Sequence, residues 1–173
     1  MPARIIGMIG VSPPQQESSL LVIEGEISPA FIVEFARAHE AAGFDMVLVG
    51  YSSSSAEGFL VAMHAAAQTE RLSYLIAHRP GFVAPTLFAR KAATFDQLTC
   101  GRLALHVITG KTDAEQEGDG DFTPKAERYQ RAQEYLHVMS APGVAKRPLI
   151  LMAGSTGYVA LTRMFARCRS RIP

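Results

Sequence analysis

The sequence predicts an α/β fold in which short parallel strands alternate with helices. The strand candidates are short, branched and apolar throughout, as expected of strands covered on both faces. The segments between them repeat apolar residues three and four positions apart, which indicates helices. The clearest step covers residues 85–110, where helical spacing, the turn Thr99-Cys100-Gly101 and an apolar strand follow one another. Right-handed crossovers then allow an open doubly wound sheet or a closed barrel, and the pattern leaves both open.

Each element follows from a local signal. Ser28 with Pro29 at the first helical position begins a helix, and Gly43 ends it. Lys111 to Pro124 is acidic and contains glycine, which predicts a mobile loop. The expected strands comprise residues 4–11, 45–50, 72–77, 102–108 and 148–152. The expected helices comprise residues 29–42, 56–69, 85–98 and 125–139, with a last helix beginning after 153–157.

Composition indicates a globular protein without a specialised partner surface. The 173 residues are 48% hydrophobic and 19% charged, enough for one domain with its own core. A net charge of +1 gives no reason to expect nucleic acid or a membrane surface as partner. No apolar run is long enough to span a bilayer, so a cytoplasmic location is expected. Cys100 and Cys168 are too few for a disulfide framework and are expected to be reduced thiols.

Several blocks in a fixed order carry a family resemblance. They are FARAHEAAGFD at 35–45, AHRPG at 77–81, PTLFARKAATFDQLTCGRLALHVITG at 85–110, ERY at 127–129 and AGST at 153–156. Together they resemble the bacterial luciferase-like flavin monooxygenases, and within them the alkanesulfonate monooxygenase branch. The resemblance implies a TIM-barrel-like fold of (β/α) repeats, with its site on loops at the carboxyl ends of the strands.

The resemblance covers only part of such a barrel. About five of the eight strands have counterparts here, which predicts a single domain, residues 1–173, truncated on its C-terminal side. Residues 165–173 form a basic tail unlike the family. An unclosed sheet leaves exposed edges, so a partner chain or a homo-oligomer is expected, and catalytic activity is expected to be impaired.

Flavin-binding candidates lie at strand ends and on one helix. Ser155 and Thr156 stand where the family binds the FMN phosphate, and a simple helix N-cap is the alternative. Tyr129 resembles a tyrosine at that phosphate, although Lys125 replaces the histidine that relatives carry one turn earlier; an ordinary half-buried aromatic is the alternative. Thr109 resembles the family residue that lies against the isoalloxazine ring, and a strand-end threonine without a function is the alternative.

A further candidate for cofactor binding is Tyr51, which follows the second strand. Catalytic candidates also follow strands. His78 and Arg79 place an imidazole and a guanidinium side by side, suited to an anionic substrate, and a surface turn is the alternative. Ser55 falls where alkanesulfonate monooxygenases carry a cysteine; it keeps a donor without an ionisable thiol, and a flexible loop is the alternative.

Other polar residues favour structural interpretations. His106 alternates with apolar neighbours and is more typical of a satisfied interior histidine than of a ligand. The acidic residues of 111–124 match no defined calcium-loop spacing, so they are interpreted as a solvated loop and no metal site is expected.

The resemblance implies a two-component monooxygenase. Reduced FMN would come from a separate NAD(P)H-dependent FMN reductase, O2 would be the oxidant, and an alkanesulfonate or related organosulfur compound would yield sulfite and an aldehyde. One alternative is an F420-dependent oxidoreductase of the same superfamily, which transfers hydride. The other is a non-catalytic, truncated protein that binds flavin or acts through assembly with other chains.

Overall fold

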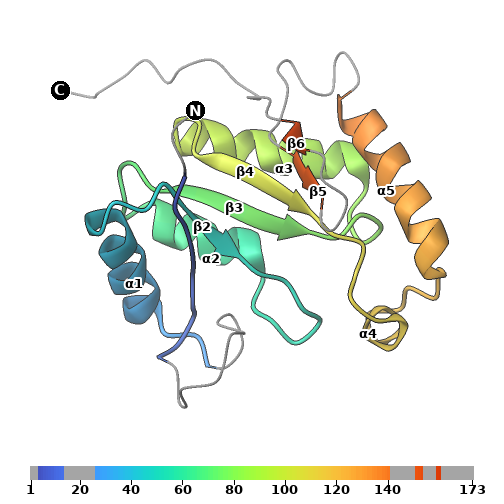
Figure 1. Cartoon of the computed structure of the whole chain (residues 1–173), viewed down its shortest axis with the longest axis horizontal. Coiled ribbons are helices and arrows are strands. Elements are labelled where there is room, and N and C mark those ends of the chain that lie inside the picture. The colour runs from blue at the N-terminus through green and yellow to red at the C-terminus, as the bar shows by residue number, and fades with distance from the viewer. Residues whose placement is uncertain (1–3, 14–25, 141–150, 154–158, 161–173) are drawn as a thin grey trace. The chain divides into compact units, whose positions relative to one another are not determined.

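A computed structural model describes residues 4–13, 26–140, 151–153 and 159–160 (Figure 1). Strands and helices alternate through most of it, which confirms the predicted α/β fold. Two compact units divide the chain, residues 1–78 and 79–173, and each is described by itself. The first contains β1 (Ile6–Met8), α1 (Pro29–Ala41), β2 (Met46–Val49), α2 (Gly58–Ala66) and β3 (Ser73–His78). The second contains α3 (Pro85–Leu98), β4 (Leu103–Val107), α4 (Asp113–Gly118), α5 (Lys125–Ser140), β5 (Leu151–Ala153) and β6 (Val159–Ala160).

In the first unit, β1, β2 and β3 are parallel neighbours in that order. Val47 of β2 pairs with Tyr74 of β3, and both side chains are fully buried. α2 approaches these strands closely at Gly58, where an added Cβ would meet Val49 at 3.4 Å and Ile76 at 3.5 Å. The unit therefore has a dry core between its strands and α2, as apolar parallel strands require.

The ends of α1 follow the sequence signals. Ser28 is the N-cap, and its hydroxyl accepts from the Phe31 amide at 3.3 Å. Gly43 has φ +82°, a left-handed conformation that suits glycine after a helix. Near this end the carboxylate of Glu40 accepts hydrogen bonds from consecutive backbone amides that lead into β3, those of Glu70, Arg71 and Leu72. One side chain thus fixes the entry to β3 against the last turn of α1.

In the second unit, β4 and β5 are parallel, and α3 packs against α5. Phe88 of α3 is buried and its ring centroid lies 6.1 Å from that of Tyr135. The Tyr135 hydroxyl donates to the carbonyl of Val83 at 2.8 Å, joining α5 to the segment that precedes α3. The turn into β4 uses two left-handed residues, Cys100 at φ 56° and Gly101 at φ 87°.

Two expectations about local structure were wrong. Residues 111–124, expected to be loop, contain the helix α4, which begins at the N-cap Thr112 because its side chain accepts from the Glu115 amide at 3.2 Å. The last helix expected after β5 is not seen at Val159–Ala160, which instead form β6, antiparallel to β5. The edge of β5 offers backbone partners there, and β-branched Val159 favours a strand.

Candidate functional site

Three predicted site residues lie at one edge of the first unit. β2 and β3 are parallel neighbours, so Tyr51, Ser55 and His78 all follow or end strands whose carboxyl ends share that edge. Tyr51 is 37% exposed, whereas His78 is buried. The Ser55 hydroxyl donates to the Ser52 carbonyl at 2.8 Å and accepts from the Ser52 amide at 3.0 Å. Ser55 therefore stabilises the turn after β2, and its catalytic role stays a prediction.

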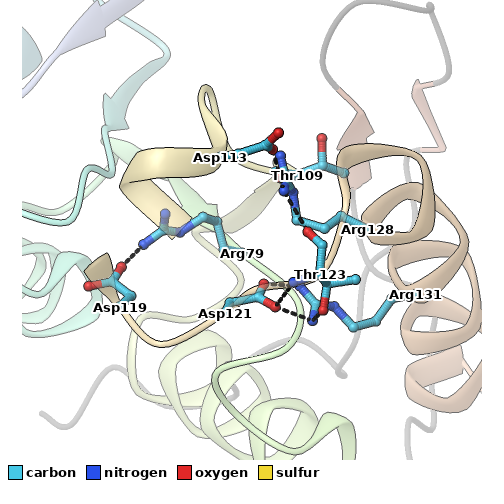
Figure 2. Close-up of polar contacts among 8 residues, drawn as sticks. All are labelled: Arg79, Thr109, Asp113, Asp119, Asp121, Thr123, Arg128 and Arg131. Carbon is cyan, nitrogen blue, oxygen red and sulfur yellow. Dashed lines mark hydrogen bonds and ion pairs between the residues drawn. The ribbon is translucent and has the colours of Figure 1, made fainter. Parts of the chain in front are cut away.

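The second unit begins with a buried guanidinium. Arg79 directly follows β3 and is 2% exposed. It forms an ion pair with Asp119 (Figure 2). Its Nη1 also lies 3.6 Å from a carboxylate oxygen of Glu115. Its guanidinium carbon also lies 4.8 Å from the centroid of the Phe82 ring. The charge predicted to face an anionic substrate is thus compensated by carboxylates from α4 and its C-cap.

A second buried arginine organises the carboxyl end of β4. Arg128 of α5 is 2% exposed, and its Nε donates to the carbonyl of Thr109 at 2.8 Å. Its Nη1 donates to a carboxylate oxygen of Asp113 and to the carbonyl of Thr123, both at 2.7 Å. Figure 2 shows the guanidinium between these three acceptors. Arg128 therefore joins the end of β4, the start of α4 and the segment before α5.

Arg131 lies one helical turn after Arg128 and makes a forked contact with Asp121. Its Nη1 also donates to the Thr123 hydroxyl at 3.2 Å. The hydrogen bond from Arg131 lowers the pKa of Asp121 far below its usual range, and the same bond raises the pKa of Arg131. The guanidinium carbon of Arg131 would lie 2.6 Å from a Cβ at Gly81, so Gly81 leaves space for this side chain.

Most of residues 111–124 are exposed, but the interpretation as a solvated loop missed the helix α4 and the ion pairs of this segment. We call residues 109–124 the clamp segment. Its carboxylates at 113, 115, 119 and 121 all pair with arginines. A sequence signal was present, because Arg128 and Arg131 are three residues apart on one helix and follow an acidic run of opposite charge. Mobility of this segment stays a prediction.

The tightest packing in the clamp segment lies just after β4. Gly110 has φ +87°, and a Cβ there would collide with the side-chain carboxamide of Gln116. Gln116 belongs to α4 and is only 1% exposed. Its Nε2 has no hydrogen-bond partner among the residues that the structure describes. Sequence reasoning missed Gln116, because a glutamine within a short acidic helix carries no distinguishing pattern.

The remaining candidates are partly described. Tyr129 is 45% exposed on α5, and Lys125 lies one turn before it, also exposed. Thr109 is partly exposed, and its carbonyl is used by Arg128. Ser155 and Thr156 lie outside the described residues.

His106 of β4 is half-buried, and burial lowers its pKa, which favours the neutral imidazole expected of an interior histidine. Among the described residues, no group of three or more His, Cys, Asp or Glu side chains could hold a metal ion. No helix in the same part of the chain is long and apolar enough to cross a membrane.

Residues 8–142 match the luciferase-like monooxygenase family. The chain belongs to this family. Among solved structures it is similar to the EDTA monooxygenase of Chelativorans sp. BNC1, with a TM-score of 0.61 and 18% identity over 78% of this chain and 35% of that one. It is also similar to an FMN complex of the oxygenating constituent of 3,6-diketocamphane monooxygenase from Pseudomonas putida, with a TM-score of 0.62 and 19% identity over 80% and 39%.

A third similar structure is an F420-dependent secondary alcohol dehydrogenase, with a TM-score of 0.65 and 18% identity. The match covers 100% of this chain and 51% of the dehydrogenase. The luciferase-like chain therefore spans between about a third and a half of the length of these structures. Its fold agrees with the expected TIM-barrel-like (β/α) repeats, present as part of a barrel.

The space beside Gly110 is filled by the side-chain carboxamide of Gln116, whose Nε2 lacks an acceptor within the described residues. The hydroxyl of Tyr129 and the ammonium of Lys125, exposed on one face of α5, are suited to a phosphate.

Proposed function

We propose that this luciferase-like chain forms the flavin-binding part of an FMN-dependent two-component monooxygenase acting on an alkanesulfonate or a related organosulfur compound. One observation carries the proposal, the family match over residues 8–142. The motifs around residues 77–110 and 127–129 support the alkanesulfonate branch. We further propose a separate NAD(P)H-dependent FMN reductase and O2 as co-reactants, a homo-oligomeric assembly and a cytoplasmic location.

FMN, when bound, would supply the oxygen-activating chemistry, and the polypeptide would hold and shield it. We assign the FMN phosphate to Tyr129 together with Ser155 and Thr156, and the ring to Thr109 and Tyr51. His78 ends β3 in a buried position, where a proton can be held away from bulk water. Ser55 lies at the same edge and offers a hydroxyl to the substrate.

The sequence predicts that Arg79 faces an anionic substrate, but its contacts favour a positioning role. Its guanidinium pairs with Asp119 and lies near Glu115, so most of its charge is compensated before any substrate arrives. We therefore propose that Arg79 acts as a positioning residue that fixes α4 against the segment that precedes α3. Substrate binding would then depend on groups other than Arg79.

The first test is fluorescence titration of the purified chain with oxidised and reduced FMN. Micromolar binding that is weakened in Tyr129→Phe and in Ser155→Ala/Thr156→Ala supports the assigned phosphate site. A soluble, folded chain that binds no FMN would contradict the proposal and favour the non-catalytic alternative. Turnover is then measured as sulfite release from alkanesulfonates with NADH, O2 and an FMN reductase.

The second candidate function is F420-dependent hydride transfer. It is favoured by the F420-dependent alcohol dehydrogenase, whose structure matches the whole of this chain. A parallel titration with F420 separates the two candidates, because the cofactor that binds more tightly indicates which chemistry the chain supports. Preference for F420 over FMN would replace the monooxygenase proposal.

A further inference from the structure

We propose that residues 111–119, which carry α4, form a flap at the carboxyl end of β4 that opens and closes as a unit while α3, β4 and α5 stay folded. Two ion pairs are its latch, and two glycines are its hinges. The inference goes beyond the proposed function, because it concerns the chain without flavin. The flap begins just after Thr109, so its position governs how a ligand reaches that residue.

The flap has no apolar anchor. Its one apolar side chain, Ala114, is exposed, and its one buried residue is the polar Gln116. Phe122, which follows the flap, is 76% exposed and does not pack the segment onto a core. A helix of six residues is too short to be stable by itself, and helices in proteins are stabilised mainly by packing an apolar face. The flap therefore gives up little apolar burial when it opens, and contacts of another kind hold it closed.

Two ion pairs hold the flap closed (Figure 2). Nη1 of Arg128 lies 2.7 Å from the carboxylate of Asp113 at the start of α4, and Arg79 pairs with Asp119 at its C-cap. Both arginines are 2% exposed, whereas the side chains of Asp113 and Asp119 are 62% and 27% exposed. Because water already reaches the carboxylates, separating these pairs costs less than breaking a fully buried ion pair. The flap is therefore held by less free energy than the core that carries it.

Glycines stand on both sides of the flap. Gly110 precedes it with φ +87°, and Gly120 follows it with φ +83°. Glycine adopts positive and negative φ at similar cost, so the chain changes direction at such positions without side-chain strain. A Cβ at Gly120 would meet nothing within 4 Å, so no neighbour blocks a change of conformation there. These two positions fit the hinges of a short rigid element.

The chain beyond each hinge is held independently of the latch. After the second hinge, Asp121 is bound by the forked contact from Arg131. Before the first hinge, the carbonyl of Thr109 accepts from Nε of Arg128 at 2.8 Å. Neither contact involves a residue of the flap. Movement is thus confined to the flap, between two fixed ends.

Native-state hydrogen exchange, followed by NMR at low concentrations of urea, tests the flap directly. The amide of Asp121, beyond the second hinge, donates to the Gln116 carbonyl of the flap at 2.9 Å, so it exchanges when the flap opens. In wild type we expect this amide to exchange faster than the amides of α3 and with almost no dependence on urea, because local opening exposes little surface. Exchange with the same free energy and urea slope as the α3 amides would overturn the inference.

Three variants separate the latch from the core. Asp119→Asn weakens one charge-assisted pair and should speed exchange of the Asp121 amide about 10- to 100-fold. Glu117→Gln removes the same charge at an exposed position of the flap and should leave that exchange unchanged. Tyr135→Phe, which removes the hydrogen bond from α5 to Val83, should speed exchange in α3 and leave the Asp121 amide unchanged.

The opposite results would contradict the flap. An Asp121 amide that exchanges equally fast in Asp119→Asn and Glu117→Gln would show that the ion pair is no latch. Acceleration of this amide by Tyr135→Phe would show that the flap opens only when the core unfolds. If Asp119→Asn does not fold, Asp113→Asn removes the other pair and is judged by the same amide.

The two proposals fail in different ways, because every exchange measurement is made without flavin. A chain that binds no FMN contradicts the proposed function alone. A chain whose flap opens only with the core contradicts this inference alone.

Discussion

The Nε of Arg128 in α5 lies 2.8 Å from the carbonyl oxygen of Thr109, which follows β4 and is 19 positions away in the sequence. The bond positions the peptide that joins Thr109 to Gly110, and thereby the surface proposed to lie against the flavin. The same guanidinium also reaches Asp113 and Thr123. The geometry of the proposed site thus depends on a side chain from outside it.

Arg128→Lys should destabilise the chain by ~2–3 kcal/mol, because an ammonium cannot reproduce the planar fork that reaches three separate acceptors. Urea unfolding measures the loss. Arg90→Lys, at an exposed position of α3, is the matched control and should change stability by less than about 0.5 kcal/mol. Equal stability of the two variants would show that the Arg128 contacts make no net contribution.

The Arg131–Asp121 pair should make stability depend on pH. The hydrogen bond from Arg131 lowers the folded pKa of Asp121, whose ordinary value is 3.8. The stabilisation is therefore complete above that ordinary value and is lost as pH falls below it. The stability difference between wild type and Asp121→Asn should stay constant from pH 6 to about pH 4 and shrink as the pH falls from there toward pH 2, as followed by urea unfolding at each pH. Glu117→Gln, at an exposed position of the same segment, is the control. Its stability difference from wild type should not change with pH.

Glu40 should be a second source of acid sensitivity. Burial alone would raise the pKa of Glu40, but the hydrogen bonds from three backbone amides outweigh it and the pKa is lowered. Glu40→Gln should cost ~1–2 kcal/mol at pH 7 because charge-assisted bonds become neutral ones. The cost should disappear as pH falls below the ordinary value of 4.5. Glu34→Gln, at an exposed site on α1, is the control, and an equal cost in both variants would contradict the role given to Glu40.

Two glycines with the same backbone conformation allow strain and packing to be separated. Gly43 and Gly110 have φ values of +82° and +87°, but an added Cβ meets nothing at Gly43 and collides with the Gln116 carboxamide at Gly110. Gly43→Ala should cost ~1–2 kcal/mol from the left-handed conformation alone. Gly110→Ala should cost a further ~1–3 kcal/mol from overpacking. Equal thermal or urea stability of the two variants would show that Gln116 moves aside freely.

The repeating elements could be predicted because their signals are local. Pro29 after Ser28 located the start of α1, and the mostly apolar run at residues 102–108 located β4. The boundaries differ by only a few residues, because helix ends and strand ends fray and depend on pairing partners. β6 could not be predicted, since a two-residue strand exists only through its pairing with β5.

The site was predicted less completely than the fold. Residues that follow or end neighbouring strands of one unit, such as Tyr51 and His78, can be placed at an edge from the topology alone. The partners of Arg79 could not be placed, because Asp119 lies 40 residues away and the acidic run offers several equivalent carboxylates. Gln116 became visible only through its burial, which the sequence does not encode in any short pattern.

The contacts of Arg128 and Arg131 with the clamp segment join residues that are close in the sequence, at most 19 positions apart. Closing such a loop costs little chain entropy compared with pairing distant strands. This part of the chain can therefore acquire its native ion pairs early in synthesis, soon after α5 leaves the ribosome. Its assembly does not need to wait for the strands that close a barrel, so a partial barrel can still present a formed end of β4.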